Sequence, residues 1–333
     1  MGPLRNRQPL TSRGLRVLVA GGNGVLGWRV IRDLVSRGHD VHALVRKESA
    51  AALVRGLGAT PHTGDLLTGL PVDTLPDRVD VIVHAATAIP VNARPSRAEW
   101  LQSDRVRLDG TRVLAEWGAS RGIRLFVLPS TVWVARPGDG APFDEGEQPN
   151  PTEFHQSAAD AESLVRELAG SNGFEAAIMR FGWYYGADVP HTTMFRDLLA
   201  RGRLPIVGDG EAYWSVIHLD DAASAVGHAV EGLRGGLWHV IDDEPVPIAE
   251  FLGTFASLLG APRPRRVPHW LARAVAGSYS TEFLTLSTLT SNARFKAEFA
   301  WQPKYPDSRQ GLRQVVEEWS ASDVHQEQSA VRP

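Results

Sequence analysis

A glycine-rich turn near the N-terminus is the feature that most constrains the fold of this chain. Residues 18–27 read LVAGGNGVLG, an apolar strand that runs into three glycines spaced three apart. In such a turn the first glycine permits a sharp bend, the second lets backbone N–H groups approach a pyrophosphate, and the third lets a helix pack closely on the sheet. The N-terminus of that helix attracts an anion. The pattern predicts a dinucleotide cradle formed by Gly21, Asn23, Gly24, Val25, Leu26 and Gly27.

The rest of the first half alternates short β-branched runs with amphipathic stretches, which is typical of βαβ units and a parallel sheet. After Gly182 the sequence becomes rich in Pro, Gly and Trp. We therefore predict an α/β fold, a Rossmann-type doubly wound parallel sheet with a smaller C-terminal substrate-binding lobe. The expected strands are 16–20, 40–45, 59–63, 79–84, 123–130 and 175–180, and the expected helices are 24–37, 49–57, 97–120, 154–171, 192–202, 219–233, 248–259 and 281–289.

The same patterns divide the chain into regions. Residues 1–14 and 320–333 are polar and are predicted to be disordered. Residues 15–182, with parts of 210–245, are predicted to form the cofactor-binding domain, and 183–319 mainly the substrate-binding lobe.

Composition excludes several classes of protein. The 333 residues carry a net charge of −3, which gives no basic footprint for nucleic acid, and contain no cysteine for disulfides or thiolate metal sites. We expect no metal. We find no apolar stretch long enough to span a bilayer and no signal-peptide core, so we expect a cytoplasmic protein that does not bind membranes. The expected partner is a small molecule, and the expected state is a monomer or homodimer.

The residues after the second strand bear on the cofactor. Arg46 and Lys47 stand about 20 residues beyond the glycines, where an NAD site places an acidic residue on the ribose. Two cations there favour a 2′-phosphate and predict NADPH, with NADH binding more weakly; the alternative is a solvated basic turn. Further cofactor contacts are expected from Asp65, beside the adenine amino group, and from Leu66, Ala85, Ala86, Thr87, Phe181 and Gly182.

An ordered set of motifs covers most of residues 15–235: VAGGNGVLG, ALVR, GDL, HAAT, DGT, FVLPST, RFGWYYG and VIHLDD. In these motifs the chain resembles the extended and atypical short-chain dehydrogenases/reductases, which are related to the NAD-dependent epimerase/dehydratases. The resemblance implies a Rossmann sheet, a nicotinamide cofactor and hydride transfer.

The chain departs from that family at its acid–base residues. The family uses a Tyr-x-x-x-Lys pair, in which the tyrosine protonates the carbonyl oxygen and the lysine lowers the pKa of that tyrosine. Aligning FHQSAADAE with the family pattern places Phe154 at the tyrosine and Ala158 at the lysine, and Arg107 replaces an asparagine. Thr131 remains as a hydroxyl donor to a substrate oxygen, with Ser130 in support, although a threonine that closes a strand is often only a β-former. His155 is expected to be exposed.

A second departure concerns the substrate. Sugar-nucleotide members carry an arginine before VxVxD, and Trp214 stands there in this chain, which argues against diphosphate recognition. Aromatic side chains are expected to form the pocket wall, although such rows are often core. The predicted substrate pocket consists of Trp133, Phe154, Trp183, Tyr185, Met194 and Trp214.

These observations predict an NADPH-dependent ketoreductase that reduces a ring ketone of an angucyclinone-like aromatic polyketide in antibiotic biosynthesis. A phenol beside the ketone would stabilise the alkoxide in place of the tyrosine. Two alternatives remain: a catalytically silent NADP-binding sensor, which the loss of both acid–base residues fits equally well, and a sugar-nucleotide-type epimerase or dehydratase.

Overall fold

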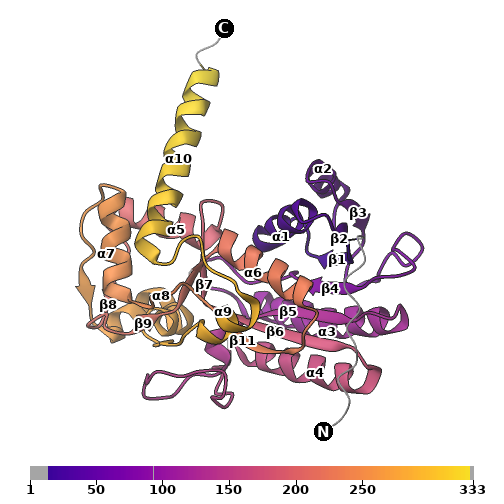
Figure 1. The fold of residues 1–333 in the computed structure, drawn as a ribbon. Helices are drawn as coiled ribbons and strands as arrows, with labels where there is room; N and C mark the ends of the chain where they lie inside the picture. The colour runs from indigo at the N-terminus through magenta and orange to yellow at the C-terminus, as the bar shows by residue number, and fades with distance from the viewer. Residues whose placement is uncertain (1–13, 93, 331–333) are drawn as a thin grey trace.

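The computed structural model describes residues 14–92 and 94–330, and its centre is a seven-stranded parallel sheet (Figure 1). The strand order is β11-β6-β5-β4-β1-β2-β3, with β1 paired to both β2 and β4. This order confirms the predicted α/β class. The strands are β1 (Arg16–Ala20), β2 (Asp40–Val45), β3 (Thr60–Thr63), β4 (Val81–His84), β5 (Leu125–Thr131), β6 (Glu175–Phe181) and β11 (Gly236–Val240).

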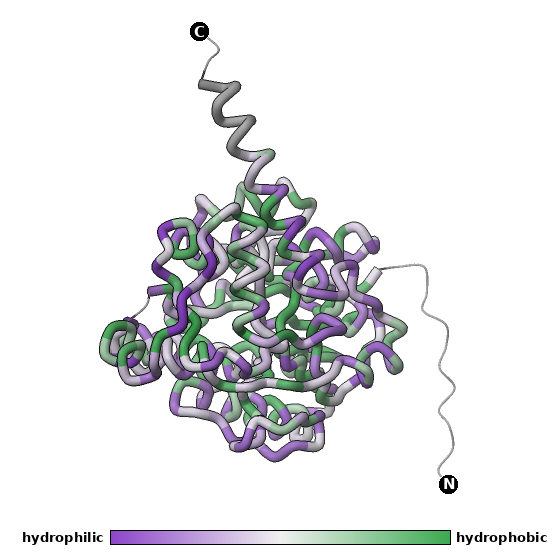
Figure 2. Tube along the Cα trace, turned by 90° about the vertical axis from the view of Figure 1, so that its left-hand side faces the viewer, coloured by the Kyte–Doolittle hydropathy of each residue, from purple (hydrophilic) through white to green (hydrophobic). Residues whose placement is uncertain are grey.

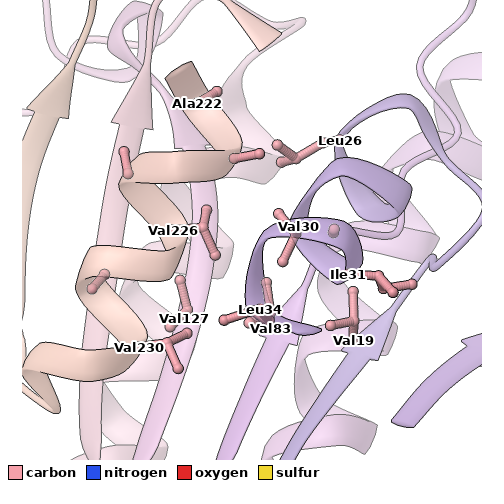
Figure 3. Close-up of a cluster of buried hydrophobic side chains, with 14 of the residues drawn as sticks. Val19, Leu26, Val30, Ile31, Leu34, Val83, Val127, Ala222, Val226 and Val230 are labelled. Atoms are coloured by element: carbon pink, nitrogen blue, oxygen red, sulfur yellow. The ribbon is translucent and has the colours of Figure 1, made fainter. Parts of the chain in front are cut away.

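Helices cover both faces of this sheet because successive strand residues point to opposite sides. Val17 and Val19 of β1 pack in one apolar cluster, whereas Leu18 and Ala20 pack in another. Figure 3 shows Val19, Val83 and Val127 of the sheet beneath α1 and α6. The first cluster is covered by α1 (Val25–Ser36), α2 (Glu48–Gly56) and α6 (Leu219–Gly232), and the second by α3 (Arg97–Ser120) and α4 (Gln156–Asn172).

A third apolar cluster forms the core of the smaller lobe and contains Trp183, Trp214 and Phe251. The lobe lies beside the ends of the central strands (Figure 1). Its strands form two-residue or three-residue pairs, namely β7 (Trp183–Tyr185) with β10 (Val216–His218), β9 (Tyr213–Trp214) with β12 (Val246–Pro247), and β8 (Ile206–Val207) with β13 (Arg266–Val267). Its helices are α5 (Pro190–Ala200), α7 (Ile248–Leu258), α8 (His269–Phe283) and α10 (Ser308–Ala330), and a 3-10 turn, η1 (Val132–Val134), follows β5.

The structure differs from the sequence expectations mainly in the second half. The helix predicted over 281–289 is wrong, because α8 ends at Phe283 and the following residues make tertiary hydrogen bonds, such as Thr288 N–H to the Tyr213 carbonyl. The seventh strand β11 and the helices α8, α9 (Ala293–Phe299) and α10 had not been predicted. From 320 to 330 the chain is helical, whereas residues 1–13, predicted as a disordered arm, lie outside the described residues.

Figure 2 shows hydrophobic and hydrophilic residues succeeding one another along single helices, which is the pattern of helices that bury one face. Within the described part of the chain, no helix combines the length and the apolar character that crossing a membrane requires.

Candidate functional site

The glycine turn after β1 is built as a cradle for phosphate. Gly21 has φ +83°, and a Cβ atom there would lie 2.6 Å from the Ala86 Cα atom, so only glycine fits. A Cβ atom on Gly27 would collide with the Gly21 carbonyl oxygen, which explains the close packing of α1. Gly24 caps α1 without any side-chain hydrogen bond, so the first turn of the helix keeps its N–H groups for an anion.

This cradle opens into a chamber of about 770 Å³ that also reaches the smaller lobe. A volume of this size lies within the ~300–1,000 Å³ typical of small-molecule sites. The chamber is lined by the ends of β1, β4, β5 and β6, by the loop 85–92, and by parts of α3, α5 and α8. The cofactor cradle and the substrate wall are therefore parts of one continuous cavity.

Most of the predicted cofactor residues line this chamber, and two do not. Arg46 is exposed but belongs to the lining. Lys47, the N-cap of α2, lies outside the lining. Gly27 also lies outside, beneath the turn. The remaining predicted contacts all line the chamber: Gly21, Asn23, Gly24, Val25, Leu26, Asp65, Leu66, Ala85, Ala86, Thr87, Phe181 and Gly182.

The chamber has the features that a nicotinamide dinucleotide requires. Asp65 is the only carboxylate among its described lining residues, and one carboxylate oxygen already accepts the Leu67 N–H. The Tyr184 hydroxyl is buried in the wall without a hydrogen-bond partner among the described residues, and burial raises its pKa above the usual range. A buried hydroxyl of this kind is satisfied when a polar ligand group occupies the chamber. The residues present therefore fit an NAD(P) cofactor.

Fewer aromatic residues line the chamber than the sequence predicts. Trp133, Phe154, Trp183 and Met194 line the chamber, whereas Tyr185 and Trp214 do not. The Tyr185 hydroxyl donates to Asp242 at 2.7 Å, and both groups are fully buried. Trp214 is also fully buried, donates to the Phe283 carbonyl at 3.1 Å, and packs behind Trp183 with ring centroids 5.3 Å apart. These two residues are lobe core, and Trp214 fixes the position of Trp183.

The positions assigned to the missing acid–base pair face the chamber. Phe154 and Ala158 both line it, although α4 begins at Gln156, two residues later than predicted, so Phe154 lies in the turn before the helix. Neither side chain can transfer a proton. A phenyl ring therefore stands at the position that the alignment gives to the family's tyrosine.

The two hydroxyls at the end of β5 have different surroundings. Ser130 donates to Glu162 at 2.6 Å, and Glu162 also forms a buried ion pair with Arg180 at 2.7 Å. The Ser130 proton is therefore held by a structural carboxylate. Thr131 lines the chamber, and no hydrogen bond between described residues involves its hydroxyl. Thr131 is the hydroxyl of the pair that is available to a ligand.

Three histidines near the site are neutral bases rather than cations. His155, expected to be exposed, is instead half-buried in the chamber wall and stacks on Trp133 at 6.1 Å. Burial and the charges of Arg107 and Arg136 lower its pKa to about 3. Burial also lowers the pKa of His191 in the wall. For His84, in the core beneath α3, burial lowers the pKa to about 4. At neutral pH none of these rings supplies a proton as an imidazolium.

Several chamber residues were not predicted as site residues. Trp100 and Arg107 of α3 and Tyr279 of α8 line the wall around Phe154. The replacement of an asparagine by Arg107 was the one sequence signal that pointed to this group. The segment AGSYST contains no sequence signal that identifies Tyr279 as a site residue, because α8 reaches the chamber through tertiary packing.

The fold and the cradle define a dinucleotide-dependent protein with an enclosed substrate chamber. The NAD dependent epimerase/dehydratase family model matches residues 17–238, so the chain belongs to this family. Two relatives are a 3-diazoavenalumate denitrifying reductase of Streptomyces sp, 33% identical over 90% of this chain and 99% of the relative, and a 4-hydroxy-2-methyl-3-oxo-4-farnesyl-3,4-dihydroquinoline-1-oxide ketoreductase of Stigmatella aurantiaca, 30% identical over 79% of each. The crystal structure of the human epimerase family protein SDR39U1 with NADPH has a similar fold, with a TM-score of 0.75 and 23% identity over 91% of this chain and 99% of the other. The chain is an NAD(P)-dependent reductase of the epimerase family.

Proposed function

We propose that this protein uses NADPH to reduce a flat aromatic substrate, and that the reduced group is a ring ketone. The observation that carries the proposal is the single chamber that joins the glycine cradle to the walls formed by Trp133, Phe154 and Trp183. The substrate would be an angucyclinone-like aromatic polyketide, and the reaction would resemble that of the angucyclinone ketoreductase of simocyclinone biosynthesis.

NADPH, when bound, supplies the hydride for such a reduction. The chain's own part begins with α1, whose uncapped N-terminus would hold the pyrophosphate. Arg46 would contact the 2′-phosphate, because it lies at the chamber edge beyond β2. The aromatic walls orient the substrate and exclude water, and Thr131 can donate one hydrogen bond to the reacting oxygen.

A proton donor is absent from the two positions where the family carries its pair, and this supports assistance by the substrate itself. A phenol adjacent to the ketone would polarise the carbonyl and stabilise the alkoxide. Replacing Thr131 by Val then removes one supporting hydrogen bond of ~0.5–1.5 kcal/mol, about tenfold in rate at most.

The test uses absorbance of NADPH with 8-hydroxy-1-tetralone and its methyl ether as substrates. We expect the hydroxy ketone to be reduced and the ether to react much more slowly while still binding. Thr131→Val should retain substantial activity on the hydroxy ketone. An inactive Thr131→Val together with normal turnover of the ether would show that the protein carries the acid.

A second candidate reaction follows from the relative whose name describes the removal of nitrogen from a diazo compound. Hydride attack on an aryl diazonium carbon forms a C–H bond, breaks the C–N bond and releases N₂, so no alkoxide forms and no proton is required. The apolar Phe154 and Ala158 fit this chemistry as well as they fit substrate assistance.

Deuterium-labelled NADPH distinguishes the two reactions. A ketoreductase places deuterium on a carbinol carbon, whereas the second reaction places it on an aromatic carbon with loss of N₂. Turnover of an aryl diazonium and none of the ketone would replace the first proposal by the second. Tight NADPH binding without turnover of either compound would favour a cofactor sensor.

A further inference from the structure

Arg107 brings a positive charge into the part of the chamber that the aromatic side chains Trp100, Phe154 and Tyr279 line. It extends from α3, lines the chamber, and donates from Nη1 to the Ser157 hydroxyl at 2.6 Å. Ser157 precedes Ala158 in α4, so the guanidinium lies next to the position where the family carries its lysine. A guanidinium has five N–H donors, and one of them is occupied by Ser157.

The charge of Arg107 has no counter-ion in contact within the part of the chain that the structure describes. Among the described residues no carboxylate lies within ion-pair distance of its guanidinium. Burial lowers the pKa of Arg107, and this effect outweighs the negative charge of Asp104 on the same helix, which raises it. The histidines that feel its charge, His84 and His155, are neutral. Arg107 is half-buried, and a partly desolvated cation that no carboxylate neutralises is stabilised by an anionic ligand.

Tyr279 supplies a hydroxyl close to the same cation. Its ring lies between Trp100, at 4.7 Å, and Phe154, at 5.1 Å between centroids. Burial raises the pKa of Tyr279 to about 12, although the charge of Arg107 pulls it down. Tyr279 is therefore a protonated donor at neutral pH, and its hydroxyl takes part in none of the hydrogen bonds among the described residues.

We infer that Arg107 and Tyr279 together bind an anionic oxygen of the substrate, a phenolate or a carboxylate carried on its aromatic skeleton. The inference rests on the proposed function, because it places this oxygen in the same chamber as the group that accepts the hydride. Arg107 of α3 and Tyr279 of α8 both line the chamber wall around Phe154, so a charged donor and a neutral donor face the same part of the chamber. The low dielectric of the chamber strengthens contacts from both to one ligand oxygen. The surrounding rings of Trp100 and Phe154 would pack on the skeleton that carries the oxygen.

The test measures binding of unreactive probes to the full-length protein saturated with NADP⁺, by quenching of tryptophan fluorescence. The phenolate probe is 4-nitro-1-naphthol with its methyl ether as the neutral match, and the carboxylate probe is 2-naphthoate with 2-naphthamide as its match. We expect at least one anion to bind ~10-fold or more tighter than its neutral match. The probe that shows the larger ratio identifies the type of oxygen. Equal binding of each anion and its match would overturn the inference.

The variants assign this preference to the two side chains. Arg107→Met should remove the preference, Arg107→Lys should keep part of it, and Tyr279→Phe should weaken anion binding ~2- to 10-fold. Arg105→Met is the matched control, because Arg105 lies on the exposed side of α3 and pairs with Asp109 at 3.4 Å. If Arg107→Met binds the anions as tightly as the wild type, or loses NADPH affinity instead, the inference is wrong.

Two further measurements, the melting temperature and the turnover, distinguish a loss of folding from a loss of anion binding. Arg107→Met removes a half-buried charge that has no carboxylate partner among the described residues, so its melting temperature should be unchanged or raised. If Arg107→Met does not fold, Arg107→Lys is used in its place. Anion-selective binding without turnover of ketone or diazonium would contradict the proposed function and leave this inference intact. Turnover with no preference for anions would support the proposed function and contradict this inference.

Discussion

The cofactor side and the substrate side of the chamber are built in different ways. On the cofactor side, the residues from Gly21 to Leu26 are neighbours in sequence, and one strand, one turn and one helix position them. On the substrate side, Trp100, Phe154 and Tyr279 come from three separate segments and meet only after the lobe packs on the sheet. The cofactor side depends on backbone geometry, whereas the substrate side depends on side chains from distant segments.

The largest expected effect tests the backbone geometry of the cofactor side. Gly21→Ala should destabilise the protein by about 1–3 kcal/mol and reduce NADPH affinity more than ~100-fold, because its Cβ atom would meet the Ala86 backbone. Gly38→Ala is the control, since Gly38 also has φ near +82° but has open space around it. Gly38→Ala should lower the free energy of unfolding by ~1–2 kcal/mol and leave NADPH affinity unchanged. If both variants lose the same NADPH affinity, the loss comes from backbone strain at a positive φ and not from the contact between the Gly21 position and the Ala86 backbone.

The next effect concerns a buried group of the cofactor side. His84 has its pKa lowered to about 4 by burial, from 6.5 in the unfolded chain, so the unfolded state binds the extra proton between these values. The stability that neutral His84 contributes is present above pH 6.5 and is lost as pH falls toward 4, by on the order of 3 kcal/mol. His84→Gln should flatten this part of the stability curve in urea titrations at pH 8 and pH 5.

Asp221 acts in the opposite direction and remains in both proteins. Burial raises the pKa of Asp221 to about 6, so its contribution grows as the pH falls. The difference between wild type and His84→Gln therefore isolates the histidine. Identical slopes would show that His84 becomes charged inside the fold.

A smaller effect tests the cofactor choice. Arg46→Ala should weaken NADPH binding ~10- to 100-fold and leave NADH nearly unchanged, because a charge-assisted contact with phosphate is worth ~1.5–3 kcal/mol. Lys47→Ala should change both affinities little, since Lys47 lies outside the chamber. Isothermal titration with both cofactors decides the point. A wild type that binds NADH and NADPH equally well would contradict the assignment.

The smallest expected effect restores the family's residues on the substrate side. Phe154→Tyr combined with Ala158→Lys should not give the ~10²-fold or larger gain of a positioned acid. The Arg107 guanidinium already lies beside Ala158, so the new lysine would face a second cation in a crowded wall. Steady-state turnover of 8-hydroxy-1-tetralone measures the outcome. A large gain would identify a decayed enzyme rather than one that uses another mechanism.

The part of the fold that the sequence predicts well is the part whose signals are local. Helix 97–120 and strands 16–20 and 40–45 appear in the structure with the predicted bounds. The helix predicted over 281–289 is wrong beyond Phe283: the apolar spacing of the segment looks helical, but residues 288–290 form hydrogen bonds with Tyr213 and Phe143 instead. Long-range hydrogen bonds of that kind leave no periodicity in the sequence.

The sequence by itself determined the glycine turn after the first strand, because a turn with positive φ and close backbone contacts requires glycine at fixed positions. It also led to the prediction that Phe154 and Ala158 stand at the positions of the acid–base pair, and both residues line the chamber. Only the tertiary structure decided that Trp214 and Tyr185 are buried behind the wall, and that Arg107 and Tyr279 face the chamber. The physical reason is that burial and charge pairing depend on which distant segments pack together, and the order of residues along the chain does not contain those contacts in local form.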